Sequence, residues 1–124
     1  RCEMVRKIQP DCVLSIHQNS YPEEAIHGAQ VFYYEDSSEG KKLAEILQKH
    51  LVEVLDKENH RQAKGNRTYY MLKKTEATLV IVECGFLSNN QEALLLTDEK
   101  YQNKVAKAIC SGTLEYLSSL AEKK

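Results

Sequence analysis

The sequence lacks the features of several protein classes. None of its apolar runs approaches the about 20 residues that a membrane-spanning helix needs. Its 17 basic and 18 acidic residues nearly cancel, and no segment is strongly basic, so nucleic-acid binding has little electrostatic support. The N-terminal residues 1–4 do not show the charged and then apolar order of a signal peptide. The chain has 124 residues, the size of one domain, and its apolar content (42%) is that of a globular protein.

The sequence also has no CxxC pair among its four scattered cysteines, Cys2, Cys12, Cys84 and Cys110. A chain of this length with ordinary apolar content does not need a disulfide framework. Free cysteines are often fully buried, so we expect structural thiols, with Cys110 on the apolar face of a helix.

Apolar periodicity along the chain alternates between strand and helix patterns. We expect strands over residues 12–17, 29–34, 69–72 and 79–83, and a polar loop over residues 58–68. We expect helices over residues 1–8 and 36–57, a third helix after the capping pair Asn89 and Glu92, and a last helix that Thr97 caps. This alternation predicts an α/β fold with a mixed, largely parallel sheet flanked by helices on both faces.

Two of the expected strands end on ionisable side chains. His17 follows the run Cys12–Leu14, and Glu83 follows the branched run Leu79–Val82. Open α/β sheets gather their chemistry beyond the carboxyl ends of strands, and burial disfavours a charge unless a partner compensates. An imidazole and a carboxylate in this arrangement indicate a metal ligand and a proton-transfer group. The structural alternatives are a hydrogen-bonded histidine and a carboxylate that reaches solvent at a strand end.

Neighbouring residues add candidates for a supporting role. Ser15 and Asn19 are placed to hydrogen-bond the loop and orient the ring of His17. Arg67 is a candidate to bind a substrate carboxylate, with a surface ion pair as the alternative. The other three histidines are weaker candidates: His27 lies in a loop without a ligand motif, His50 at the edge of a helical stripe, and His60 in a polar loop.

These residues resemble a known family. The segments 15–20, 27–34 and 82–89, in this order and at this separation, resemble the zinc-dependent N-acetylmuramoyl-L-alanine amidases. Residues 28–34 and 69–72 look most like the spore germination-specific subgroup.

The resemblance implies an activity and a site. These enzymes hydrolyse the amide between N-acetylmuramic acid and L-alanine of peptidoglycan, using Zn²⁺-activated water. By the same resemblance His17 corresponds to a zinc ligand and Glu83 to the catalytic carboxylate. The implied substrate is spore cortex peptidoglycan, during maturation or germination, and the implied location is the extracytoplasmic cell envelope. The alternative is a non-catalytic cell-wall-binding or scaffold module with the same fold.

The resemblance also implies that part of the catalytic domain precedes residue 1. The family places two further zinc ligands upstream, so residues 1–124 are expected to be a single, N-terminally truncated domain. A lone protein ligand binds zinc poorly, and we expect this chain to be inactive by itself. Exposed apolar faces are expected to favour a homo-oligomer or a swapped assembly.

Overall fold

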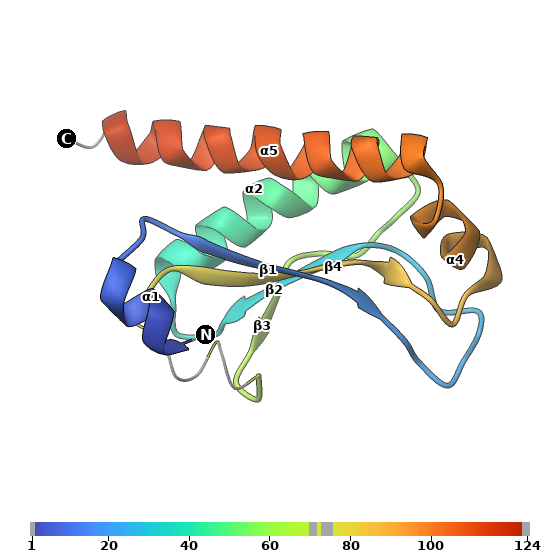
Figure 1. The fold of residues 1–124 in the computed structure, drawn as a ribbon, viewed down its shortest axis with the longest axis horizontal. Helices are drawn as coiled ribbons and strands as arrows, with labels where there is room; N and C mark the ends of the chain where they lie inside the picture. The colour runs from blue at the N-terminus through green and yellow to red at the C-terminus, as the bar shows by residue number, and fades with distance from the viewer. Residues whose placement is uncertain (1, 70–71, 73–75, 123–124) are drawn as a thin grey trace.

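The computed structural model describes residues 2–69, 72 and 76–122. Four helices and four strands are defined in that part of the chain (Figure 1). The helices are α1 (Cys2–Ile8), α2 (Ser38–Leu55), α4 (Asn90–Leu96) and α5 (Glu99–Glu122). The strands are β1 (Val13–Asn19), β2 (Gln30–Tyr34), β3 (Lys64–Asn66) and β4 (Leu79–Phe86).

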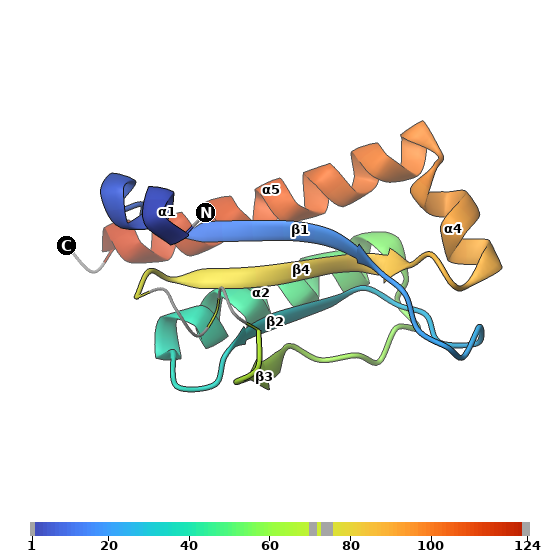
Figure 2. The same cartoon turned by 60° about the horizontal axis from the view of Figure 1, so that its bottom comes forward.

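The strands form one mixed sheet in the order β1-β4-β2-β3 (Figure 2). β1 runs parallel to β4 and β3 parallel to β2, whereas β2 and β4 are antiparallel. All eight residues of β4 are buried because this apolar strand lies inside the sheet. The expected class, an α/β fold with a mixed sheet flanked by helices, is therefore confirmed.

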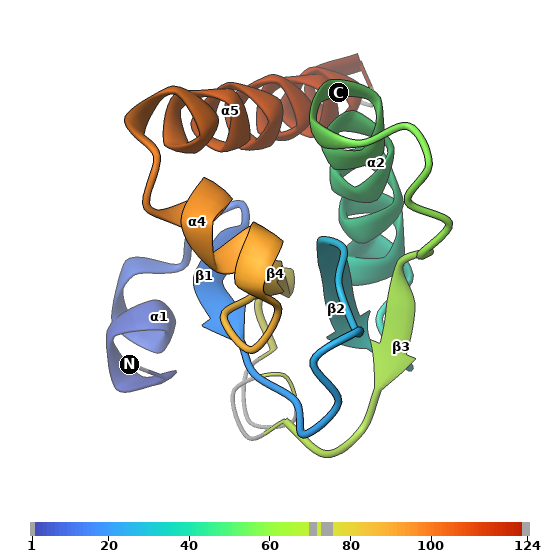
Figure 3. The same cartoon turned by 90° about the vertical axis from the view of Figure 1, so that its right-hand side faces the viewer.

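Two long helices cover one face of the sheet. Viewed along the strands, α2 lies over the sheet and α5 lies next to α2 (Figure 3). Leu43, Leu47 and Leu51 recur at four-residue spacing on α2 and are fully buried against the face that carries Val80 and Val82. These contacts make the main hydrophobic core.

The opposite face of the sheet carries a smaller apolar cluster. Leu79 and Ile81 of β4 lie there with Leu72, and Phe32 and Tyr69 pack against them. Because successive strand side chains alternate between faces, the next residue of this series on β4, two after Ile81, is Glu83. The chemistry-bearing carboxylate is thus on the more thinly covered face.

Helix ends follow the expected chemistry with one exception. Asn89 caps α4, because its side-chain oxygen accepts the N–H of Glu92 at 3.0 Å. The prediction that Thr97 caps the last helix is wrong: its hydroxyl donates to the carbonyl of Leu94 and closes α4. Asp98 caps α5 instead by accepting the N–H of Tyr101 at 3.2 Å.

Other expectations need correction. β3 lies inside the predicted loop over residues 58–68, where a Lys-Gly-Asn segment shows no apolar alternation. The strand expected over residues 69–72 falls partly outside the described residues, and Tyr69 belongs to no strand. Cys84 is buried as expected, whereas Cys110 is exposed, because it lies one residue past the buried stripe of α5. Among the described helices, none is both long and apolar enough to cross a membrane.

Candidate active site

The parallel pairing of β1 with β4 brings the two predicted site residues together. In the register of this pair, Val13 lies opposite Leu79 and His17 lies opposite Glu83. Neighbouring strands are about 4.8 Å apart, and paired residues in register point to the same face. His17 and Glu83 therefore share one rim and one face of the sheet. This is the arrangement that a metal ligand and a proton-transfer group at one site require.

Glu83 is buried at the centre of this site. Its side chain is 6% exposed, and its Oε2 atom has no hydrogen-bond partner among the described residues. Burial raises the pKa of this carboxyl group, and the nearby His17 partly offsets the shift. The alternative of a carboxylate that reaches solvent is therefore wrong. A raised pKa and an unused acceptor are typical of a proton-transfer group.

His17 is exposed and is held by a neighbour on its own strand. The Oγ atom of Ser15 lies 2.6 Å from Nε2 of His17, so the predicted orienting contact is present. Asn19 acts at another place: its carbonyl accepts the N–H of Leu87, and its side chain accepts the N–H of Ser20. Asn19 thus joins the ends of the two strands and makes none of the described contacts to the ring of His17.

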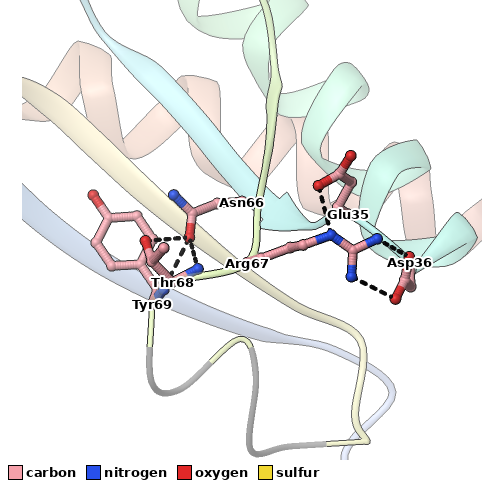
Figure 4. Close-up of polar contacts among 6 residues, drawn as sticks. All are labelled: Glu35, Asp36, Asn66, Arg67, Thr68 and Tyr69. Atoms are coloured by element: carbon pink, nitrogen blue, oxygen red, sulfur yellow. Dashed lines mark hydrogen bonds and ion pairs between the residues drawn. The ribbon is translucent and has the colours of Figure 1, made fainter.

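The structure does not bring Arg67 to this rim. Its guanidinium group pairs with Glu35 at 2.9 Å and with Asp36 at 2.7 Å, beyond the far end of β2 (Figure 4). Gln30, which faces Glu83, begins the same strand, and four residues of strand span about 13 Å. The surface ion pair is what the geometry shows, and a substrate contact by Arg67 stays a prediction.

The remaining histidines make no described contact with the pair. Nε2 of His50 lies 2.9 Å from Glu115 and links α2 to α5, whereas His60 is exposed. The carbonyl of His27 accepts a hydrogen bond from Arg61. In the described part of the chain, no group of three or more His, Cys, Asp or Glu side chains is arranged to hold a metal ion.

The donor set at the rim fits part of a zinc site. An imidazole is a preferred zinc ligand, and the orphaned carboxylate beside it fits the proton acceptor of a catalytic metal centre. A catalytic zinc takes about three protein ligands, more than this rim supplies among the described residues.

Three residues near the site were missed by sequence reasoning. Tyr69 lies on the same face of the sheet as Glu83, and the centre of its ring is 5.6 Å from that of Phe32. Burial, and to a smaller extent the negative charge of Glu83, raises the pKa of Tyr69. Arg61 binds the carbonyl of His27, shortly before β2, and Glu92 binds the N–H of Phe86 at the end of β4. No pattern marked Arg61, and Glu92 and Tyr69 were noticed only as a capping residue and as part of an expected strand. Contacts between distant elements leave no local signal of a role near the site.

Comparisons with known proteins agree with this geometry. The family model of N-acetylmuramoyl-L-alanine amidase matches residues 1–115. The germination-specific N-acetylmuramoyl-L-alanine amidase of Bacillus subtilis is 36% identical over 118 residues, which cover 95% of this chain and 49% of that protein. The chain therefore spans about half the length of this relative.

Solved structures show the same fold. The CwlD amidase of Clostridioides difficile, determined in complex with the GerS lipoprotein, has a TM-score of 0.91 and 41% identity over 94% of this chain and 59% of that chain. An N-acetylmuramoyl-L-alanine amidase of Clostridium difficile 630 has a TM-score of 0.88 and 28% identity over 95% and 63%. With its paired His17 and Glu83 and a family match over residues 1–115, the chain belongs to the N-acetylmuramoyl-L-alanine amidase family.

Proposed function

We propose that the protein to which this chain belongs hydrolyses the amide bond between N-acetylmuramic acid and L-alanine in peptidoglycan. The observation that carries the proposal is the in-register pair of His17 and Glu83 on one face of the sheet, with a buried carboxylate oxygen that has no described partner. The family match supports the same bond.

Glu83 is the proton-transfer group in this proposal. Its raised pKa suits a base that takes a proton from the attacking water and then returns that proton as an acid to the leaving nitrogen of L-alanine. Both transfers need a carboxyl group fixed beside the scissile bond, and the central position of β4 provides a rigid support.

Zn²⁺ is the proposed cofactor, and His17 is the residue of this chain that would hold it. When bound, the metal supplies a Lewis acid for the carbonyl oxygen and lowers the pKa of water. Ser15 orients the ring of His17 by the 2.6 Å contact. The remaining ligands would come from outside the described residues.

The biological setting follows from the relatives. Similarity to a germination-specific amidase and to probable cell wall amidases supports action on spore cortex peptidoglycan at the cell envelope. The neighbour solved with a lipoprotein makes a lipoprotein a candidate partner for this protein as well.

The test is release of stem peptides from purified peptidoglycan by the full-length protein and its variants. Glu83→Gln keeps the shape of the side chain but removes the base, so we expect kcat to fall by about 10²–10⁴-fold. Glu53→Gln makes the same change on the exposed side of α2 and should leave the rate unchanged. Undiminished release by Glu83→Gln would refute the proposal.

A further inference from the structure

Glu92 joins two segments next to the candidate active site. One of its carboxylate oxygens accepts the backbone N–H of Phe86 at 2.9 Å, and both oxygens lie 3.0 Å from the backbone N of Gly28. Phe86 ends β4 three residues after Glu83, and Gly28 lies two residues before β2. The expected reciprocal contact of Glu92 with its cap Asn89 is replaced by these two longer-range bonds.

The carboxylate occupies the place where the β2–β4 ladder stops. Gln30 faces Glu83 in the antiparallel register, and two residues farther along Gly28 would face Gly85. Instead of this pairing, the side chain of Glu92 accepts N–H groups from both segments. A charge-assisted bond to a carboxylate is stronger than a neutral backbone bond, so the two segments are held firmly although they are no longer paired.

On its other edge, β4 carries an irregularity at the same point. His17 lies opposite Glu83, but the next pair is Asn19 with Phe86, so β4 has one residue more than β1 in this interval. Such a bulge bends the strand and re-aims the side chains beside it. Glu83 is thus the last paired residue before this bulge, and Glu92 binds Phe86, the first paired residue after it.

The glycines of both segments make room for this contact. A Cβ atom on Gly85 would lie 3.3 Å from Cδ and from Oε1 of Glu92. Gly28 has φ of +105°, and a Cβ atom there would lie 2.9 Å from Oδ1 of Asn59 and 3.2 Å from Nε of Arg61. The two backbones thus approach the polar groups more closely than other residues would allow.

Arg61, which carries the opposite charge to Glu92, contacts the same two segments. Its Nε donates to the carbonyl of His27 at 2.8 Å, and its guanidinium carbon lies 5.2 Å from the centre of the Phe86 ring. The segments on both sides of the ladder end are therefore fixed by one carboxylate and one guanidinium, which come from separate parts of the chain.

We propose that Glu92 is a positioning residue for the reaction: by binding Phe86 and Gly28 it fixes the β4 bulge and so the direction of the Glu83 carboxylate. This inference rests on the proposed function, because Glu83 is taken as the proton-transfer group. Glu92 acts through the backbone and does not itself touch substrate.

The experiment compares Glu92→Ala and Glu92→Gln with Gln91→Ala, which changes an exposed neighbour on α4. Displacing a catalytic group by about 1 Å costs about 100-fold, so kcat of Glu92→Ala should fall by about that factor while KM changes less than about threefold. Glu92→Gln keeps one oxygen acceptor and should recover part of kcat. Gln91→Ala should match the unmodified protein.

A second measurement does not depend on turnover. Hydrogen exchange of the full-length protein should show faster exchange at the amides of Gly28 and Phe86 in Glu92→Ala, with the core amides of Val80 and Val82 still protected. If Glu92→Ala does not fold, the same comparison is made with Glu92→Gln, in which the amide of Gly28 loses one of its two acceptor oxygens and should exchange faster.

The outcomes separate the two proposals. Unchanged exchange at Gly28 and Phe86, or a kcat of folded Glu92→Ala within about twofold of the unmodified protein, overturns the positioning role. An equal loss of kcat in the control Gln91→Ala overturns it as well. Failure of the proposed function would appear differently, as full activity of Glu83→Gln.

Discussion

The Oγ atom of Ser15 lies 2.6 Å from Nε2 of His17, and both side chains extend from the same face of β1. Side chains two residues apart on a strand point to the same face of the sheet. The pair therefore belongs to a single strand, and Ser15 contacts the imidazole from β1 itself.

This contact predicts the effect of Ser15→Ala on metal binding by the full-length protein. The ring of His17 would lose its orienting partner, and loss of such a contact typically weakens metal affinity by about 10–100-fold. Zinc titration by calorimetry measures the change. Ser111→Ala, on the exposed side of α5, is the matched control and should bind zinc as the unmodified protein does. Equal Kd values for Ser15→Ala and the control would show that the contact does not support the metal.

The buried carboxyl group of Glu83 predicts a pH-dependent stability. Its pKa in the folded state is raised above 4.5, so burial of this carboxyl group does not destabilise the fold below about pH 4.5. The destabilisation grows as the pH rises from there to the folded pKa and is constant above it. Glu83→Gln resembles the neutral form. We expect this variant to be more stable than the unmodified protein by about 1 kcal/mol at pH 7 and equally stable at pH 4.

Urea denaturation of metal-free protein at the two pH values measures this difference. Glu53→Gln, an exposed change of the same type on α2, should alter the free energy of unfolding little at either pH. A Glu83→Gln variant that is less stable than the unmodified protein at pH 7 would contradict a buried, unpaired carboxylate.

Close packing of α5 on α2 predicts the cost of enlarging Gly112. A Cβ atom at this position would lie 2.8 Å from Cδ2 of Leu47, which is fully buried, and 3.4 Å from its Cα atom. Gly112→Val should therefore lower the free energy of unfolding by about 1–3 kcal/mol. Ser111→Val adds the same side chain one position away on the exposed surface, and chemical denaturation should show a much smaller change. Equal effects of the two substitutions would argue against tight helix packing.

The apolar surface of α1 and β1 predicts association of this 124-residue chain. Met4, Ile8 and Ile16 are 64%, 65% and 55% exposed, and β1 forms an edge of the sheet among the described strands. A charged side chain on an edge strand opposes association, so Ile16→Lys should lower the average mass in sedimentation experiments. Leu114→Lys, at a position 58% exposed on α5, should leave it unchanged. A chain that is monomeric before any substitution would refute this expectation.

Much of the fold followed from local patterns. Four-residue spacing of leucines indicated α2, a run of branched residues indicated β4, and Asn89 was a correct helix cap. β3 escaped notice because three residues of Lys-Gly-Asn carry no periodic signal, and only their pairing with β2 makes them a strand.

Part of the site was also visible in advance. His17 and Glu83 each stand at the end of an apolar run, where an ionisable group is unusual enough to be noticed. For Arg67 the sequence left two alternatives open, a substrate contact and a surface ion pair. It could not decide between them because the partners Glu35 and Asp36 are about 30 residues away in the chain. Such contacts depend on which elements become neighbours.

The amino-acid sequence by itself determined the class of fold and the two ionisable groups that follow apolar runs, because apolar periodicity and an unusual charge are local properties. It placed both groups at strand ends, whereas β1 continues to Asn19 and β4 to Phe86. Tertiary structure alone decided that β1 pairs with β4 in the register that sets His17 opposite Glu83. It also decided that Glu92 reaches back to Gly28 and Phe86 rather than to its own cap. Register and long-range hydrogen bonds are fixed by how buried faces pack, and that packing exists only when the whole chain has folded.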